Sequence, residues 1–358
     1  MAWLGILTAI GLLGAACVSV ADPEGWAAPT TVDDSLFASI ENGKMAALDP
    51  TDFSTTWIFP PDTKEGDRLD LEAIYHTPIV GTETVYFAGY DGIVYALNAD
   101  DGAIRWTFET GGPIIGGLAL AGDTIYVGSD DGMLYALDLE DGVPKLPAFD
   151  AGDGIWATSL VASSVLYVPS VSGDLHALDI QTLESVWPKP FEANAGLLTD
   201  PVLADGNTLL VGGIDRSLYA LDLDTGSQKW SFDAAGWFWG RPLVADGKIY
   251  VPNLDSHVYA LDATTGEKLW SFETEAGVRS PTILAGDVLI VVDQKGNVYG
   301  LNPDTGTLKW SGPAVLEKTV LAGPMLMEND EVLILAQGGD LFSVSSTTGA
   351  WVRVGVQP

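Results

Sequence analysis

The residues of this sequence best suited to chemistry are aromatic and arginine side chains that could recognise a partner. Such side chains are enriched at protein interfaces, where they supply much of the binding energy. The candidates gather in short segments that recur along the chain: Trp26, Tyr75, His76, Trp156, Trp237, Phe238, Trp239, Arg241 and Arg279. They predict a recognition surface for a peptide, another extended chain or a glycan.

Residues that commonly carry out catalysis or bind metals are scarce. The sequence holds one cysteine, Cys17, and three histidines, His76, His176 and His257. Histidines this scattered do not predict a metal site. The sequence has no Gly-x-Ser-x-Gly turn, no phosphate-binding loop and no dinucleotide-binding glycine pattern. We therefore predict no catalytic residue, no metal and no cofactor.

Cys17 is a candidate for lipid attachment. It follows an uncharged apolar stretch that ends in Leu12-Leu13-Gly14-Ala15-Ala16, which resembles a bacterial lipoprotein cleavage site. Two features depart from that pattern: Gly14 stands where leucine is usual, and no Lys or Arg precedes Lys44. Simple secretion and a retained membrane helix are the alternatives, because about 20 apolar residues can span a bilayer. We expect a signal segment at residues 1–16, a short tether at 17–25 and an extracytoplasmic, membrane-anchored domain.

The elements that position the candidate residues belong to a repeat of about 40 residues. Its copies are anchored at Asp49, Asn98, Asp138, Asp179, Asp222, Asp262, Asn302 and Ser345. Glycine follows the anchor by four residues except at Phe53 and Leu183, and tryptophan follows it by eight except at Leu146 and Arg353. This period, built of short alternating strands, is typical of a β-propeller with one four-stranded antiparallel blade per repeat. Residues 26–358 are therefore predicted to form an all-β, eight-bladed propeller.

Each repeat predicts four strands, A to D. In the sixth copy, alternation and turn residues place them at 242–245, 248–253, 257–262 and 268–272. In propellers the connection from strand D to strand A of the next blade reaches the mouth of the central channel. The candidate recognition residues lie on these D–A connections. The alternative is that Trp26, Tyr75, Trp156 and Trp239 only wedge between inner strands.

The repeated apolar residues have structural roles. One strand-C position holds leucine in every copy but the last, which holds Val344, and we expect this position to be core. The strand-D tryptophans are too regular for a binding site and should pack between blades, with glycine permitting positive φ at the preceding turn. His176 takes a position held elsewhere by tyrosine, so it too should be structural.

The charge of the chain narrows the choice of partners. Lys and Arg total 16 and Asp and Glu total 49, which gives a net charge of −33. Such a surface repels phosphate backbones, so nucleic acid is excluded as a partner.

A polar insertion at residues 60–68 lengthens the first interval between copies and predicts a surface loop.

The repeated Ala-Leu-Asp, Thr-Gly and Trp pattern, best seen in residues 259–270, resembles the pyrroloquinoline quinone-like (PQQ-like) propeller repeat. That family contains quinoprotein dehydrogenases and non-enzymatic relatives. The latter include the lipoprotein B subunit of the outer-membrane β-barrel assembly machinery, an eight-bladed scaffold. With eight copies and a candidate lipidated cysteine, the chain resembles this non-enzymatic branch more closely.

The resemblance implies a non-catalytic scaffold that binds other extracytoplasmic or membrane proteins, as a monomeric propeller. Many quinoprotein dehydrogenases carry two adjacent cysteines beside the quinone, and this chain has one cysteine in all. A ligand-sensing propeller and a PQQ-dependent dehydrogenase remain the alternatives.

Overall fold

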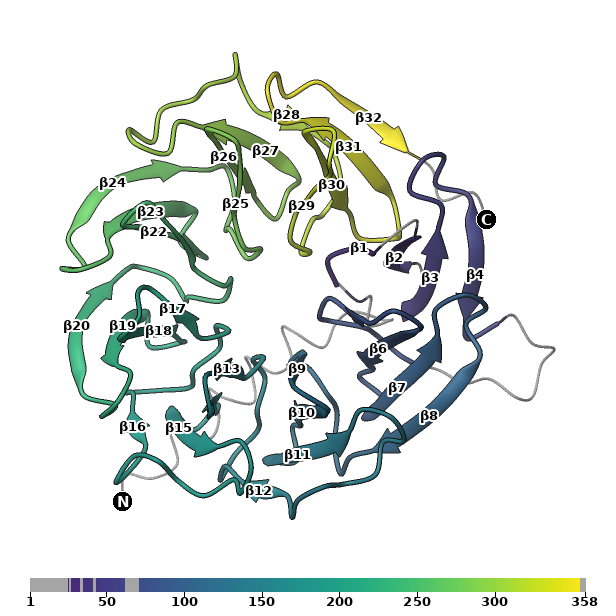
Figure 1. The fold of residues 1–358 in the computed structure, drawn as a ribbon. Coiled ribbons are helices and arrows are strands. Elements are labelled where there is room, and N and C mark those ends of the chain that lie inside the picture. Colours follow the sequence, from purple (N-terminus) through teal and green to yellow (C-terminus); the bar gives the residue numbers. More distant parts are fainter. Residues whose placement is uncertain (1–24, 26, 33–34, 41–42, 62–70, 355–358) are drawn as a thin grey trace, which may run out of the picture.

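The computed structural model describes residues 25, 27–32, 35–40, 43–61 and 71–354. These residues form eight four-stranded antiparallel sheets. Figure 1 shows the sheets arranged as blades around a central axis. The prediction of an all-β, eight-bladed propeller is confirmed.

The first four blades take their strands in chain order. They are blade 1, with β1 (Thr30–Val32), β2 (Ser35–Ile40), β3 (Lys44–Leu48) and β4 (Thr55–Phe59); blade 2, with β5 (Ile79–Val80), β6 (Thr84–Ala88), β7 (Ile93–Asn98) and β8 (Ile104–Glu109); blade 3, with β9 (Leu118–Ala121), β10 (Thr124–Gly128), β11 (Met133–Asp138) and β12 (Phe149–Asp150); and blade 4, with β13 (Leu160–Ala162), β14 (Val165–Pro169), β15 (Asp174–Asp179) and β16 (Phe191–Glu192).

The last four blades follow the same order. They are blade 5, with β17 (Val202–Leu203), β18 (Thr208–Gly212), β19 (Ser217–Asp222) and β20 (Gln228–Asp233); blade 6, with β21 (Leu243–Ala245), β22 (Lys248–Asn253), β23 (His257–Asp262) and β24 (Lys268–Glu273); blade 7, with β25 (Ile283–Ala285), β26 (Val288–Val292), β27 (Asn297–Leu301) and β28 (Ala314–Val315); and blade 8, with β29 (Met325–Leu326), β30 (Glu331–Leu335), β31 (Leu341–Ser345) and β32 (Trp351–Val354).

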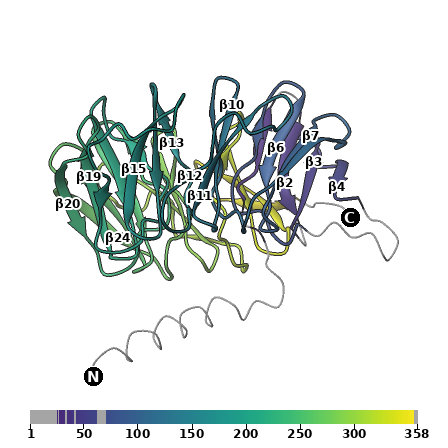
Figure 2. The ribbon, with the colours of Figure 1, turned by 90° about the horizontal axis from the view of Figure 1, so that it is seen from below.

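The antiparallel order separates the loops into two sets. Strands A and C run opposite to strands B and D, so the D–A and B–C connections lie at one end of the ring. We call this the D–A end. The A–B and C–D connections lie at the other end, and Figure 2 shows the ring edge-on with loops at both ends of the strands. The D–A connections lead to the innermost strands, so their last residues lie at the channel mouth.

Strand D is shorter in blades 3, 4 and 7 than the sixth copy suggested. In these blades it contains two residues, as in β12. Isolated bridges such as Leu137 to Pro144 and Leu178 to Ser185 continue the pairing outside the regular strand. Proline cannot donate a ladder hydrogen bond, and Pro144 and Pro188 stand inside the two interrupted segments.

The strand-C leucines form the predicted core. Leu97, Leu178 and Leu261 have no exposed surface, and Val344 in the last copy has none either. The hydrophobic clusters contain residues of neighbouring blades, such as Leu48 of blade 1 with Leu333 and Leu341 of blade 8. Each blade therefore completes its core against the next.

The strand-D tryptophans lock neighbouring blades together. Each faces the C–D glycine of the next blade, and a Cβ on that glycine would lie less than 3.0 Å from the indole ring. The pairs are Trp57 with Gly102, Trp106 with Gly142, Trp187 with Gly226, Trp230 with Gly266, Trp270 with Gly306 and Trp310 with Gly349. In five pairs the indole N–H also donates to a backbone carbonyl of the next blade at 2.8–3.2 Å. Glycine is thus required at this position for two reasons: it adopts the left-handed turn, and its missing Cβ leaves room for the indole.

The exceptions to the repeat fall into the same pairs. Blade 3 has Leu146 in place of tryptophan, and blade 4 has Leu183 in place of the facing glycine. Blade 8 has Arg353 in place of tryptophan, and blade 1 has Phe53 in place of glycine. Leu183 and Phe53 keep the left-handed turn, with φ of 56° and 58°, and their side chains pack in the clusters at these two seams. A larger turn residue therefore replaces the missing indole.

These substitutions divide the ring into two arcs. The tryptophan–glycine locks join blades 1–3 into arc 1 and blades 4–8 into arc 2. The seam between blades 3 and 4 keeps a hydrogen bond from the Tyr126 hydroxyl to the Ile180 carbonyl at 2.5 Å. The seam between blades 8 and 1 is closed by apolar packing. Neither seam has the lock that joins the other blades.

Candidate recognition surface

Four of the candidate residues share one structural position. Each D–A connection from blade 2 to blade 8 makes a bend at the inner edge, at His76, Gly116, Ala157, Thr199, Gly240, Ser280 and Ala322. The residue before the bend is Tyr75, Trp156, Trp239 or Arg279 in four connections and Ile115, Leu198 or Leu321 in the others. The propeller thus places these four side chains at equivalent points around the channel mouth.

The bends are packed too tightly for most side chains. A Cβ on Gly116 would lie 2.8 Å from the Ala157 carbonyl oxygen, and one on Gly240 would lie 2.6 Å from the Arg279 carbonyl oxygen. Six of the seven bend residues are Gly, Ala, Ser or Thr. His76 is the exception, and its imidazole needs space away from the packed backbone of the bend.

His76 reaches from blade 2 to blade 5. The next connection provides space at Gly117, where a Cβ would lie 3.1 Å from both Cβ and Cδ2 of His76. The Nε2 atom of His76 lies 3.5 Å from Oδ1 of Asp200, and the two side chains are 29% and 25% exposed. This is an ion-pair contact between the connections that enter blades 2 and 5.

The connections of blades 3 and 4 join the same network. The Thr158 N–H donates to Oδ1 of Asp200 at 2.7 Å, and the Gly117 N–H donates to the Thr158 hydroxyl at 3.0 Å. We call His76, Gly117, Thr158 and Asp200 the mouth bridge. It joins four consecutive D–A connections on one side of the channel mouth.

The contacts of the mouth bridge shift the pKa values of both His76 and Asp200. Burial alone would lower the pKa of His76, but the Asp200 carboxylate and the Ile115 carbonyl outweigh it and raise that pKa, while the Arg279 charge opposes them. Burial would likewise raise the pKa of Asp200, but His76, the Thr158 N–H and Arg241 together lower it. Both shifts favour the charged pair.

The aromatic side chains at the mouth are held by neighbours. Tyr75 meets Tyr90 edge to face at 5.5 Å between ring centroids, and burial raises the pKa of Tyr75 to about 12. The Trp156 indole N–H donates to the Asp130 carboxylate at 2.6 Å. The Arg279 guanidinium lies 4.0 Å from the centroid of Trp239, a cation–π contact. Their orientations are thus set before any partner arrives.

Most of the candidate residues are accessible, and one is not. Tyr75, His76, Trp156, Trp237, Trp239 and Arg279 are partly exposed and Arg241 is exposed. Phe238 has no exposed surface and packs in the core with Phe232, so it supports the surface from beneath. Trp26 lies outside the described residues.

Asp200, Thr158 and Gly117 did not stand out in the sequence. Their only signal is positional: Asp200 occupies the place that holds Thr77, Arg241, Pro281 or Gly323 in other copies.

His176 packs edge to face against Phe149 at 5.1 Å between ring centroids, as a structural residue would.

Three lysines at the opposite end of the ring lie in ion pairs. Lys145 contacts Asp123 and Asp138 at 2.8 and 3.2 Å. Lys248 contacts Asp304 at 2.8 Å, and Lys309 also pairs with Asp287. Arg241 at the channel mouth makes no ion pair with any other described residue. Arg241 therefore gives the channel mouth an exposed guanidinium that no described carboxylate pairs with.

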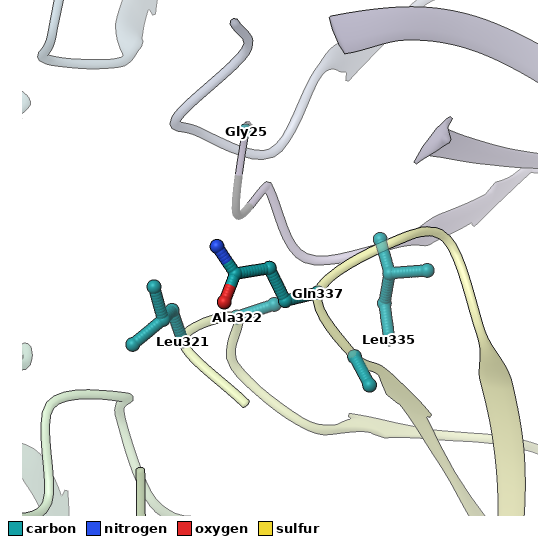
Figure 3. A pocket seen from close by; sticks show the side chains of 6 residues that line it. Gly25, Leu321, Ala322, Leu335 and Gln337 are labelled. Carbon is teal, nitrogen blue, oxygen red and sulfur yellow. The ribbon is translucent and has the colours of Figure 1, made fainter. Parts of the chain in front are cut away.

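A small cavity lies beside the seam between blades 8 and 1. It is lined by Gly25, Leu321, Ala322, Leu335, Ala336 and Gln337, and Figure 3 shows Gln337 extending along it. Its volume of about 10 Å³ is room for no more than one water. The cavity is thus not a ligand site.

Two other sequence expectations concern the N-terminal segment and metal binding. Cys17, the signal segment at 1–16 and most of the tether at 17–25 lie outside the described residues, as does most of the polar insertion at 60–68. No helix within the described ranges is long and apolar enough to cross a membrane. Among the same residues, no group of three or more His, Cys, Asp or Glu side chains could hold a metal ion.

A protein-family model matches most of the chain. The model is described as outer membrane protein assembly factor BamB and matches residues 23–145 and 172–357. Its gap contains the seam between blades 3 and 4, where the tryptophan–glycine lock is absent.

Two curated relatives carry the same description. The BamB protein of Yersinia pestis is 25% identical over 217 residues, which cover 56% of this chain and 52% of that protein. The BamB protein of Salmonella typhimurium is 26% identical over 212 residues, covering 55% and 50%. The chain therefore spans about half the length of the curated relatives it matches.

Three solved structures share the fold. BamB from Moraxella catarrhalis has a TM-score of 0.67 and 21% identity over 77% of this chain and 86% of that one. The computationally designed Ika8 protein has a TM-score of 0.72 and 13% identity, covering 88% and 94%. Quinohemoprotein alcohol dehydrogenase from Comamonas testosteroni has a TM-score of 0.71 and 13% identity, and the match covers 94% of this chain and 75% of that one. These likenesses concern architecture alone.

Proposed function

This chain belongs to the family described as outer membrane protein assembly factor BamB, and on that premise we propose that it is a non-catalytic propeller that binds partner proteins outside the cytoplasm. The observation that carries the proposal is the shared position of Tyr75, Trp156, Trp239 and Arg279 around one channel mouth. Partly exposed aromatic and arginine side chains on a rigid support are the groups that dominate protein interfaces. The D–A end is the surface that a partner contacts.

The exposed charge supports the same end. Arg241 stands at the mouth of a propeller whose sequence carries a net charge of −33. A partner with a basic surface is attracted at long range by the whole molecule, and the arginines select a local acidic or carbonyl group. Polyanions such as nucleic acid are repelled.

The proposal is tested by asking which end of the ring touches a partner. The photoreactive residue p-benzoylphenylalanine is placed at Trp237 on the D–A end or at exposed Glu140 in a C–D turn. Irradiation in the native cell should give a discrete crosslinked protein from position 237 and none from position 140. Equal products from both positions would rule out the D–A end as the specific surface.

The dehydrogenase alternative rests on the shared fold with quinohemoprotein alcohol dehydrogenase. It requires the purified protein to carry a quinone, visible as an absorbing chromophore. It also requires turnover of an alcohol or sugar after addition of PQQ and calcium. The scaffold proposal expects neither.

We further propose that Cys17 is lipidated and anchors the propeller to a membrane. Replacing Cys17 with serine should move most of the protein from the membrane fraction to the soluble fraction, because a lipid chain contributes about 0.8 kcal/mol for each buried CH₂ group. The measurement is a quantitative immunoblot of both fractions. Retention of Cys17→Ser in the membrane would favour an uncleaved helix instead.

A further inference from the structure

The recognition surface is divided between the two arcs. Tyr75 and His76 enter blade 2 in arc 1, whereas Trp237, Trp239, Arg241 and Arg279 lie on connections into blades 6 and 7 of arc 2. The seams between the arcs lack the tryptophan–glycine lock. The seams are closed instead by apolar packing and by the Tyr126 hydrogen bond, so a polar contact across the mouth adds to what holds one arc against the other.

We propose that the mouth bridge is this contact: His76 of arc 1, held against Asp200 of arc 2, positions the two parts of the recognition surface relative to each other. The inference deepens the proposed function and rests on it. His76 and Asp200 act as positioning residues, since they set where other side chains stand.

Three features single out His76 for this role. It is the one large side chain among seven otherwise small bend residues. The neighbouring connection has Gly117, which leaves room for the imidazole. The opposing Asp200 is already fixed by the Thr158 N–H at 2.7 Å, so the imidazole meets an oriented carboxylate. His76, Gly117 and Asp200 thus lie on three different D–A connections.

The bridge also crosses the unlocked seam at a second point. Gly117 enters blade 3 and Thr158 enters blade 4, and their hydrogen bond of 3.0 Å spans the seam. Loss of the His76 charge would weaken the hold on Asp200, and through it on Thr158. The amides of Thr158 and Gly117 therefore report the state of the bridge.

The pH range follows from both partners. The pKa of His76 is raised above 6.5, so its charge is complete below 6.5 and is lost as the pH rises through the raised value. The pKa of Asp200 is lowered from 3.8, so its charge is complete above 3.8. Arg279 faces His76, Arg241 faces Asp200, and Tyr75 next to His76 stays neutral with a pKa of about 12. The bridge is complete between these limits and weakens on the alkaline side.

The test compares His76→Gln with His257→Gln in the full chain. The glutamine side chain keeps a donor but carries no charge, while His257 lies 3.4 Å from Asp255 within a single blade and does not span the arcs. Hydrogen exchange of the Thr158 and Gly117 amides, corrected for intrinsic rates, should accelerate about tenfold in His76→Gln. It should stay at the wild-type rate in His257→Gln.

The wild-type protein supplies a test that needs no substitution. The same two corrected exchange rates should rise as the pH is raised from about 6 to about 9, through the raised pKa of His76, and this dependence should be absent in His76→Gln. Crosslinking to a partner from position 237 should fall over the same range. If the exchange rates do not change with pH and are the same in the wild type and His76→Gln, the proposed role of the mouth bridge is overturned.

The readouts separate this inference from the proposed function. Hydrogen exchange requires no partner, so it judges the bridge alone. If position 237 crosslinks a partner equally at both pH values and in His76→Gln, the positioning role is overturned while the scaffold function stands. If exchange behaves as expected but no partner is crosslinked, the scaffold function fails, and with it the role in recognition.

Discussion

Replacing Gly142 with alanine should lower the free energy of unfolding by about 3–5 kcal/mol, which combines backbone strain with overpacking. Gly142 has φ of +72°, and a Cβ there would lie 2.5 Å from Cε3 of Trp106. The indole cannot retreat without losing the hydrogen bond from its N–H to the Leu139 carbonyl at 3.2 Å. Urea unfolding followed by tryptophan fluorescence measures the change.

Gly247 provides a control for the strain alone. It has the same φ of +72°, but a Cβ there would meet no atom within 4 Å. Gly247→Ala should therefore cost only the left-handed backbone, about 1–2 kcal/mol. Equal losses from the two variants would mean that the glycine is needed for its turn and not for the facing indole.

The second large effect is expected at the seam that lacks the lock. Leu146→Trp should destabilise the protein by about 1–3 kcal/mol, because the indole would meet the Leu183 side chain. Leu183→Gly should cost about 2–4 kcal/mol through the cavity it leaves, less the strain relieved at its φ of 56°. Each change is unfavourable on its own.

The double variant Leu146→Trp, Leu183→Gly should recover stability, because it rebuilds the pair found at six other seams. The coupling energy between the two sites should be about 2–3 kcal/mol in favour of the double change. A double-mutant cycle from urea unfolding measures it. Additive losses would show that the paired exceptions are a coincidence of sequence and not a substitute for the lock.

The sequence predicted the architecture because the repeat is regular. Eight copies with alternating strands define eight blades, and the strand-C leucines identify the buried face without three-dimensional information. In blade 6, strands B and C were predicted at the residues observed for β22 and β23, and strand D was one residue short of β24. Local patterning sets these features.

The pairing of exceptions required the structure. Leu146 and Leu183 are separate irregularities in the sequence, and only the ring brings strand D of one blade against the C–D turn of the next. The same limit applies at the channel mouth. The inward packing of Phe238 depends on contacts with Gly212 and Phe232. The contact between His76 and Asp200 joins connections of blades three apart in the ring, which no local pattern predicts.

Photocrosslinking from position 237 shows whether the D–A end of this BamB-family propeller binds a protein partner. A discrete product should form at 237 and not at Glu140 on the opposite end. Its yield should fall about tenfold or more when Trp239→Ala and Arg241→Ala are added, since interface aromatics and arginines often contribute about 2 kcal/mol or more. A product that forms equally at both positions, or that is unchanged by the two substitutions, would mean that the D–A end is not the binding surface.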